Sequence, residues 1–370
     1  MQQRVIISQN IEHDLAQAIA ETEHDRVFVL TDDITQECCL PKVASLFAKH
    51  NATTITIRHD DTNKTLATLA DVWTALQRGG ATRHSLLVNL GGGMVTDLGG
   101  FAAATFKRGI NFINIPTTLL AMVDAAVGGK TGINFGGLKN EVGAFANARY
   151  VIVNTCFLDT LDTANLCSGY AEMLKHSLIS NAQMWAEHVN FDILQPDLAE
   201  LQRMVAASIT VKEHIVADDP HEHGIRKALN FGHTIGHALE EFSMQQPGDA
   251  VVSARLLPLA RARTAPKNTL LHGYAVAFGL IGELYISARK AGFPTARLHQ
   301  TTRFIRENYG AMAFTCDDYP TLLNLMRHDK KNTSDTINFT LLHDIGDIRI
   351  NQTATDEEIR EALDFIREGY

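Results

Sequence analysis

Short runs of β-branched and other aliphatic residues recur through the first 160 positions of this 370-residue chain, with polar segments between them. Between two of these runs, residues 65–77 place their apolar side chains at the spacing of an amphipathic helix. Strands that alternate with helices are typical of a parallel α/β sheet. We predict buried strands at residues 26–30, 52–57, 84–90, 110–115 and 150–154.

Beyond Thr160 the apolar residues follow helical periodicity, so the second half is predicted to be mostly α-helical, with one small β element at residues 336–350. The sequence therefore predicts an α/β domain of residues 1–160, a helical domain of residues 161–370, and a site in the cleft between them. A segment rich in proline and arginine, residues 243–269, is predicted to be an insertion. The predicted helices cover residues 166–180, 197–216, 229–242, 272–292 and 356–369.

The chain is 45% hydrophobic and carries a net charge of −9, which is typical of a globular protein and argues against a nucleic-acid partner or an anionic membrane surface. No apolar run reaches the roughly 20 residues that span a bilayer, and the N-terminal segment lacks the apolar core of a signal peptide. Five irregularly spaced cysteines favour reduced thiols over a disulfide framework. These features predict a cytoplasmic protein.

The segment LNFGHTIGHALEEF, residues 229–242, places His233, His237 and Glu240 on the helix face opposite an apolar stripe. Two histidines one turn apart are able to bind a single metal ion, although such a face also occurs as a plain solvated surface. The HExxH protease signature is absent, because Thr234 follows the first histidine.

Further candidate ligands lie in two other predicted helices. Glu172 has Lys175 one turn later on the same helix face, and His272 begins the next helix. One carboxylate and two histidines with an open position are typical of a divalent-metal site, for which zinc is the first candidate. His221 and His223 compete for the same role, because spacing alone does not choose between them.

A glycine-rich turn, residues 91–93, follows the strand predicted at residues 84–90 and opens a helix. Backbone N–H groups in such a turn are able to approach a phosphate, so we favour the pyrophosphate of a dinucleotide over a turn without a ligand. The GxGxxG fingerprint does not fit, because Thr96 stands where the third glycine belongs. Asp97, in the first helical turn, is placed to hydrogen-bond a ribose or a nicotinamide group.

Residues 116–145 carry Asp124, Lys130, Lys139 and Asn140 in an apolar, glycine-rich setting. Lysines in such surroundings usually have an anionic partner, because an unpaired buried charge is costly; exposed loop lysines are the alternative. Cations and amides in an acidic chain favour a small polyanionic substrate. Elsewhere the chain adds Lys107, Arg108, Arg226, Asn230, Lys330 and Lys331.

Several of these motifs occur together, in order, over roughly residues 60–332, and with them the chain resembles the 3-dehydroquinate synthase family of sugar-phosphate cyclases. The resemblance implies an N-terminal NAD-binding α/β domain, Rossmann-like with a non-standard glycine-rich turn, a helical C-terminal domain for metal and substrate, and a homodimer. The matching strings are GGGMVTDLGGFAAATFKRG, IPTTLLAMVDAAVGGKTGIN, KNEVGAF, SGYAEMLKH, GIRKALNFGHTIGHALE, LHGYAVAFG and DKKN.

The resemblance also implies roles for individual residues. The metal, zinc or cobalt, would be held by Glu172, His233 and His272. Glu240 receives no role and would either hydrogen-bond a metal ligand or lie on the surface. The residues expected to contact NAD are Asp61, Lys64, Gly93, Met94, Val95, Thr96, Asp97, Thr117, Thr118, Lys130, Lys139, Phe157, Leu158, Asp159 and Thr160. The residues expected to contact substrate are Arg108, Asp124, Lys130, Asn140, Lys175, Lys212, Arg226, Asn230, His237 and one of Lys330 and Lys331.

Three features depart from the family pattern. Asp60 and Asp61 stand where Gly-Glu is usual, so the ribose contact would be shorter. Tyr274 replaces the acid of the usual HGE triplet after the last metal ligand. The spacing from His233 to His272 is longer than usual because it contains the predicted insertion, which would have to leave the site as a surface loop.

The activity implied is conversion of 3-deoxy-D-arabino-heptulosonate 7-phosphate, a small sugar phosphate, to 3-dehydroquinate and phosphate in the shikimate pathway. NAD would remove a hydride and return it within one turnover, and the cations would stabilise the leaving phosphate. The alternatives are a cyclase for another heptulose phosphate, a metal-dependent polyol dehydrogenase, and a non-catalytic protein that keeps only the fold.

Overall fold

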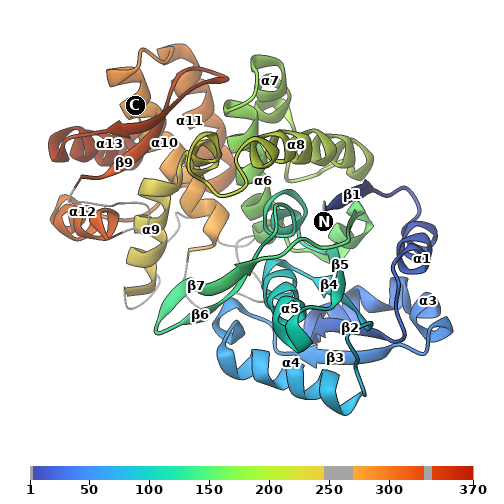
Figure 1. Cartoon of the computed structure of the whole chain (residues 1–370). Helices are drawn as coiled ribbons and strands as arrows, with labels where there is room; N and C mark the ends of the chain where they lie inside the picture. Colours follow the sequence, from blue (N-terminus) through green and yellow to red (C-terminus); the bar gives the residue numbers. More distant parts are fainter. Residues whose placement is uncertain (1–2, 246–269, 329–335, 370) are drawn as a thin grey trace. The chain divides into compact units, whose positions relative to one another are not determined.

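The computed structural model describes residues 3–245, 270–328 and 336–369. The chain divides into two compact units (Figure 1). The first comprises Met1–Leu161 and Asp197–Ile209, and the second comprises Asp162–Pro196 and Thr210–Tyr370. From residue 246 onward the predicted insertion lies outside the described residues, as do Lys330 and Lys331.

A six-stranded parallel sheet in the order β1-β8-β5-β4-β2-β3 forms the centre of the first unit. The five predicted strands are confirmed, and β2 and β4 are buried along their whole length, as expected of a parallel sheet that is covered on both faces. The edge strand β1 was not predicted, because its four residues give too short an apolar signal. The strands are β1 (Arg4–Ile7), β2 (Val27–Asp32), β3 (Thr53–Ile57), β4 (Leu86–Gly91), β5 (Asn111–Pro116) and β8 (Tyr150–Val153).

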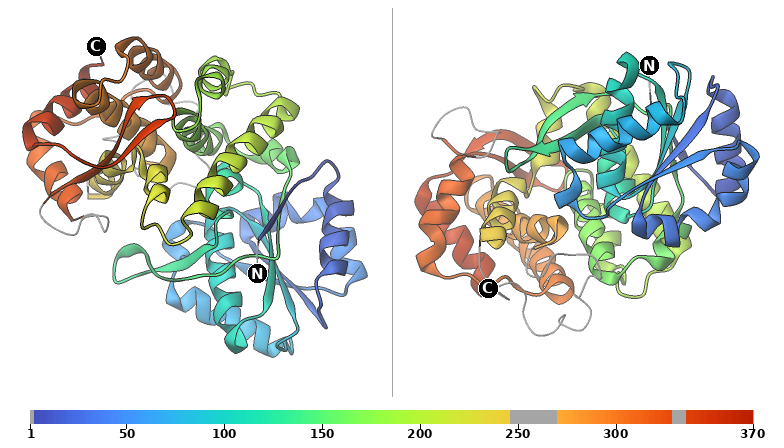
Figure 2. Two further views of the ribbon diagram at one scale, coloured as in Figure 1. Left: turned by 45° about the horizontal axis from the view of Figure 1, so that its top comes forward. Right: turned by 90° about the horizontal axis from the view of Figure 1, so that it is seen from below.

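Helices connect these strands (Figure 2). Side-chain caps fix where several of the helices begin. Asp32 and Thr35 form a reciprocal capping box at the start of α2, and Thr65 caps α4. The α-helices are α1 (Ile11–Glu21), α2 (Asp33–Cys38), α3 (Ala44–Lys49), α4 (Leu66–Arg78) and α5 (Gly93–Thr105). Short helical turns are η1 (Leu40–Lys42), η2 (Asp61–Asn63), η3 (Phe106–Arg108), η4 (Ala121–Ala125) and η5 (Thr155–Thr160).

The strand order reverses beside β2, because the chain passes from β3 to the opposite side of β2 to form β4. In open parallel sheets, ligands bind outside the carboxyl ends of the strands at such a switch point. The glycine-rich turn follows the carboxyl end of β4 directly, so the fold places it at the expected ligand-binding edge.

An antiparallel hairpin, β6 (Lys130–Phe135) and β7 (Leu138–Phe145), lies outside the six-stranded sheet and was not predicted. Gly136 and Gly137 form its turn, both at positive φ, which suits a two-residue hairpin connection. Neither strand shows apolar alternation, and β7 is exposed along most of its length, so its sequence looks like a loop. The hairpin carries Lys130, Lys139 and Asn140.

The second unit is mostly helical, with one antiparallel hairpin, β9 (Asn338–Asp344) and β10 (Asp347–Thr353), as predicted. The helix predicted at residues 229–242 begins only at His233, because Gly232 has positive φ and residues 225–230 form a 3-10 turn. No helix among the described residues is long and apolar enough to span a membrane. The helices are α6 (Thr163–Leu178), α7 (Ala182–Asn190), α8 (Leu198–Asp218, which begins in the first unit), η6 (Ile225–Asn230), α9 (His233–Gln245), α10 (His272–Lys290), α11 (Thr295–Tyr309), η7 (Cys316–Asp318), α12 (Tyr319–Arg327) and α13 (Asp356–Glu368).

Candidate functional site

Glu172 and Lys175 lie one turn apart on α6 of the second unit, and both side chains are buried. Lys175 Nζ donates a hydrogen bond to Glu172 Oε2, so the two opposite charges share one buried environment. Burial opposes ionisation of Glu172, but Lys175 and His233 outweigh it and hold the pKa of this carboxyl well below its ordinary value. Glu172 is therefore a carboxylate at neutral pH.

The first residues of α9 and α10, His233 and His272, present their Nε2 atoms to one oxygen of Glu172. The distances from Glu172 Oε1 are 3.3 Å to His233 Nε2 and 3.5 Å to His272 Nε2. This buried oxygen has no hydrogen-bond partner among the described residues. One carboxylate oxygen and two imidazole nitrogens lie within 4.8 Å of one another, and a divalent cation among them would satisfy all three.

The remaining ring nitrogens of both histidines also have partners. His272 Nδ1 lies 2.9 Å from Glu240 Oε2, and His233 Nδ1 lies 3.1 Å from the backbone oxygen of Phe231. Such contacts orient metal-binding histidines and direct Nε2 toward the ion. Burial opposes protonation of His272, but Glu240 and Glu172 raise its pKa to about 10, so a bound metal would have to displace a proton.

Glu240 thus has a structural partner that the sequence alone did not reveal, because its contact joins two helices separated by a long connection. Its side chain is buried, as is that of His233, so this face of α9 is not a solvated surface. Tyr274, at the position of the missing acid, is also buried and packs edge-on against Tyr309 with ring centroids 5.1 Å apart. The carboxylate that contacts His272 therefore comes from Glu240 on α9, and not from position 274.

Among the other candidate histidines, His237 lies beside the possible metal ligands. Its ring centroid is 5.3 Å from that of His233 and 5.9 Å from that of His272. The rival candidates, His221 and His223, lie in the loop between α8 and η6, where their rings are 6.2 Å apart. The possible metal ligands that lie together with His233 and His272 therefore include Glu172 as the third residue.

Two of the residues expected to contact substrate, Arg226 and Asn230, lie on the 3-10 turn η6. The Asp219 carboxylate shapes the loop before this turn by accepting hydrogen bonds from the backbone N–H groups of Gly224, at 2.6 Å, and Arg226, at 3.1 Å. Arg226 is buried and donates to the backbone oxygen of Pro220, so its guanidinium is held in place. Lys212, on α8, is also buried.

In the first unit, the glycine-rich turn leads directly from β4 into α5. Gly92 is the N-terminal cap of α5, and no side chain among the described residues caps this helix. A Cβ atom at Gly92 would lie 3.0 Å from Thr118, so the turn passes close to the segment that follows β5. Uncapped backbone N–H groups at a helix N-terminus are suited to a phosphate.

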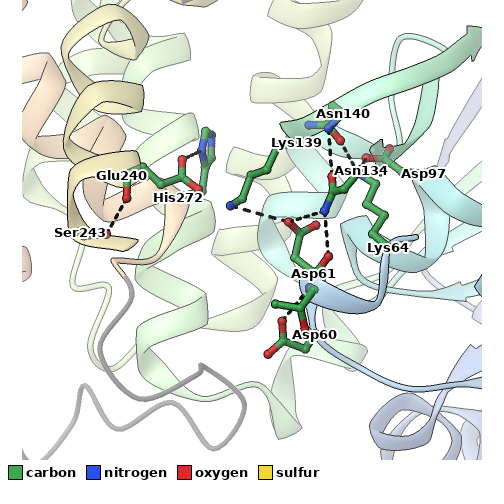
Figure 3. Close-up of polar contacts among 11 residues, drawn as sticks. Asp60, Asp61, Lys64, Asp97, Asn134, Lys139, Asn140, Glu240, Ser243 and His272 are labelled. Carbon is green, nitrogen blue, oxygen red and sulfur yellow. Dashed lines mark hydrogen bonds and ion pairs between the residues drawn. The ribbon is translucent and has the colours of Figure 1, made fainter. Parts of the chain in front are cut away.

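The side chain of Lys64 contacts two other residues that were predicted for the NAD or substrate site, both in the first unit (Figure 3). Its Nζ atom lies 2.5 Å from Asp97 Oδ2 on α5 and 2.5 Å from Asn140 Oδ1 on β7. Burial raises the pKa of Asp97, and the ion pair with Lys64 only partly offsets this effect. Lys139, on β7, lies 3.7 Å from Asp61 Oδ2 in the turn η2.

Asn134, for which the sequence predicted no role, completes this network from β6 (Figure 3). Its side-chain nitrogen donates to the backbone oxygen of Asp61 at 2.9 Å, and its side-chain oxygen accepts from the backbone N–H of Asn140 at 2.9 Å. Its own N–H donates to the Lys64 backbone oxygen at 2.8 Å. A single asparagine in a glycine-rich segment gives no sequence signal for such a role.

The other predicted residues of the first unit occupy separate elements. Asp124 lies in η4, and Lys130 begins β6. The end of η5 is formed by Phe157, Leu158, Asp159 and Thr160. There Asp159 Oδ2 pairs with Lys42 Nζ at 2.6 Å. Arg108 ends η3 and lines an open hollow of about 360 Å³ with Lys107 and Arg83. Lys107 and Arg108 both have positive φ, which few residues with long side chains adopt.

The chain thus combines a Rossmann-like parallel sheet with a mostly helical unit that contains this glutamate–histidine group. The chain belongs to the 3-dehydroquinate synthase family. The family model described as 3-dehydroquinate synthase N-terminal matches residues 54–168, and the model described as 3-dehydroquinate synthase C-terminal matches residues 169–256 and 261–332.

Individual relatives agree with this assignment. A 3-dehydroquinate synthase from Parabacteroides distasonis is 50% identical over 369 residues, covering 100% of this chain and 99% of the relative. Another, from Clostridium tetani, is 32% identical over 92% of this chain and 86% of its own length.

Two solved structures share the fold. A 2-deoxy-scyllo-inosose synthase complexed with carbaglucose-6-phosphate, NAD⁺ and Co²⁺ has a TM-score of 0.81 at 22% identity, covering 100% of this chain and 96% of that chain. A 2-epi-5-epi-valiolone synthase from Streptomyces hygroscopicus, with NAD⁺ and Zn²⁺ bound, has a TM-score of 0.81 at 23% identity over 100% and 98% of the chains.

Proposed function

We propose that this protein is a cyclase that converts 3-deoxy-D-arabino-heptulosonate 7-phosphate to 3-dehydroquinate and phosphate, a carbon–oxygen lyase step of the shikimate pathway. The observation that carries the proposal is the 50% identity to a 3-dehydroquinate synthase over the whole chain. The group of Glu172, His233 and His272, in which Glu172 and His233 are buried, supports it, because an inactive protein would have little need of so costly an arrangement.

We propose NAD and a divalent metal, zinc or cobalt, as cofactors, as in the solved structures of related cyclases. Glu172, His233 and His272 would hold the metal, and the uncapped start of α5 with the Lys64–Asp97 pair would receive NAD. When bound, the metal would lower the pKa of an alcohol of the substrate and NAD would take up and return a hydride, chemistry that serves to acidify the C–H next to the leaving phosphate.

The chain's own residues would bind and orient the substrate. Cations and hydrogen-bond donors stabilise a leaving phosphate dianion, and the candidates are Lys175, Arg226, Asn230, His237, Arg108 and one of Lys330 and Lys331. Asp124, Lys130, Asn140 and Lys212 would hold the carboxylate and the hydroxyls. The burial of Lys175, Lys212 and Arg226 supports these roles, because cations removed from water interact strongly with an anion.

We further propose that the protein acts as a cytoplasmic homodimer on this small molecule, without a nucleic-acid or membrane partner. Four apolar side chains of the β6–β7 hairpin support self-association, because they are exposed on a single element: Phe135, Leu138, Val142 and Phe145. Light scattering coupled to size-exclusion chromatography would test the dimer, and a mass of one chain at micromolar concentration would contradict it.

Phosphate release with only catalytic NAD tests the proposed activity. With excess heptulosonate phosphate, a divalent metal and substoichiometric NAD, phosphate should accumulate over many turnovers while NADH absorbance stays near baseline. NADH formed one-for-one with consumed substrate, or equal oxidation of simple polyols, would instead identify a polyol dehydrogenase. Phosphate release from another heptulose phosphate alone would identify a different cyclase.

A further inference from the structure

Glu283, a residue without a role in the proposed reaction, lies in the interior of the second unit. Its side chain is on α10 and is fully buried. One carboxylate oxygen accepts the backbone N–H of Gly232 at 2.7 Å, and the other accepts those of Thr234, at 2.9 Å, and Ile235, at 3.2 Å. These three donors surround His233, the first residue of α9.

A carboxylate in this place has a clear physical effect. The first N–H groups of a helix lack partners within it, and the N-terminus carries a partial positive charge. Hydrogen bonds to an ionised acceptor are stronger than neutral ones, and two oxygens that accept three donors fix both the position and the rotation of the helix start. Glu283 therefore fixes the backbone from which the imidazole of His233 projects.

Glycines bring the two helices into backbone contact at the same place. A Cβ atom at Gly279 of α10 would lie 1.9 Å from the backbone oxygen of Gly232, and one at Gly236 of α9 would lie 3.0 Å from the backbone oxygen of Ala275. Neither helix can shift toward the other, and Glu283 opposes their separation.

The same helix also carries a proposed metal ligand. His272 is the first residue of α10, and Glu283 lies three turns further along it. The start of α10 is in turn attached to α6, the helix of Glu172, because the Gly273 N–H donates to Ser168 Oγ at 3.0 Å. A single rigid helix thus connects the backbones that bear all three proposed ligands.

We propose that Glu283 is a positioning residue of the metal centre, which sets His233 at the correct distance from His272 and Glu172. The inference rests on the proposed metal site and adds a residue that does not touch the metal. It predicts that loss of the carboxylate weakens metal binding, and not only the stability of the fold.

Ser287 provides a matched control on the same helix. It is buried one turn after Glu283, its Oγ donates to the Glu283 backbone oxygen at 2.6 Å, and it accepts the N–H of Leu342 on β9 at 3.0 Å. Ser287→Ala therefore removes buried hydrogen bonds of α10 without releasing the start of α9.

The experiment compares Glu283→Gln, Ser287→Ala and wild type in the full-length protein. Zn²⁺ affinity is measured by competition with a chromogenic chelator, the site geometry by the visible absorption of Co²⁺-loaded protein, and stability by thermal unfolding without metal. Glu283→Gln should weaken Zn²⁺ binding about 10- to 100-fold and change the Co²⁺ spectrum. Ser287→Ala should lower the melting temperature but keep wild-type affinity and spectrum.

Wild-type Zn²⁺ affinity and an unchanged Co²⁺ spectrum in Glu283→Gln would overturn the proposal and leave Glu283 as a helix cap only. Equal losses of affinity in Glu283→Gln and Ser287→Ala would overturn it as well, since general destabilisation would explain both. His272→Ala tests the metal site itself: if it keeps wild-type Zn²⁺ affinity, the proposed ligand set is wrong irrespective of Glu283.

Discussion

At the scale of single residues, buried charges are the feature that separates this protein from an ordinary α/β structure. Glu172 and Lys175 are both excluded from solvent, and each compensates the charge of the other on one helix turn. Removal of one partner of such a pair is strongly destabilising, because an uncompensated charge stays buried. A metal ion at Glu172 would supply a second source of compensation.

Lys175→Met keeps the volume of the side chain and removes its charge. In metal-free protein we expect a loss of about 3–5 kcal/mol in the free energy of unfolding, because Glu172 loses its cation. Saturating Zn²⁺ should reduce this loss, which urea unfolding with and without metal would measure. The control Lys42→Met breaks a partly exposed pair with Asp159 and should cost no more than about 1 kcal/mol. A loss of equal size with and without Zn²⁺ would show that Lys175 does not compensate the metal-binding carboxylate.

At the scale of elements, the β6–β7 hairpin and the connection between α9 and α10 matter most for the two proposed cofactor sites. The hairpin supplies Asn134, Lys139 and Asn140 to the network around Lys64 and Asp61. The connection separates two proposed metal ligands in the sequence, yet its ends meet: the Leu270 N–H donates to Ser243 Oγ at 3.1 Å.

Asn134→Ala should weaken NAD binding about 10-fold, because it removes the hydrogen bonds that hold the Asp61 turn to the hairpin, each worth roughly 0.5–1.5 kcal/mol. Zn²⁺ affinity should stay at the wild-type value. Calorimetric titration with NAD measures the effect. Thr131→Val is the control, because it removes only a bond within the hairpin, from Thr131 Oγ1 to the Ala144 backbone oxygen. Equal NAD affinity in Asn134→Ala and wild type would refute a positioning role for Asn134.

Replacement of residues 246–268 by a short Gly/Ser linker should leave Zn²⁺ affinity within a few-fold of wild type. The reason is that Ser243 and Leu270 already lie within hydrogen-bond distance, and a change of loop length alters closure entropy only slowly. Metal titration of the shortened protein checks this expectation. A protein that folds but no longer binds Zn²⁺ would mean that the replaced segment takes part in the metal site.

At the scale of the whole molecule, each compact unit contains one of the two proposed cofactor sites. The first holds the glycine-rich turn at the switch point of its sheet, and the second holds the carboxylate and the two histidines. Because the residues proposed for each cofactor lie in different units, the affinity for NAD and the affinity for Zn²⁺ can be measured and altered separately. The predictions for Asn134 and Glu283 rely on this separation, because each variant should affect one cofactor only.

Short apolar runs and helical periodicity in the sequence were sufficient for five of the six strands of the parallel sheet, most helices around the proposed metal site and the small β9–β10 hairpin. The buried strands are continuous apolar runs, and the helices have apolar faces that repeat at the helical period, so local sequence carries their signal. The same holds for the candidate residues, because glycine-rich turns and paired histidines are contiguous motifs.

Only the tertiary structure decided how those residues are held. Glu240 against His272, Asn134 against Asp61 and Glu283 against the start of α9 are contacts between elements distant in the chain. The β6–β7 hairpin also escaped prediction, because its mostly exposed residues lack an apolar alternation. A buried carboxylate is specified by the donors that converge on it, and those donors come together only when the helices pack.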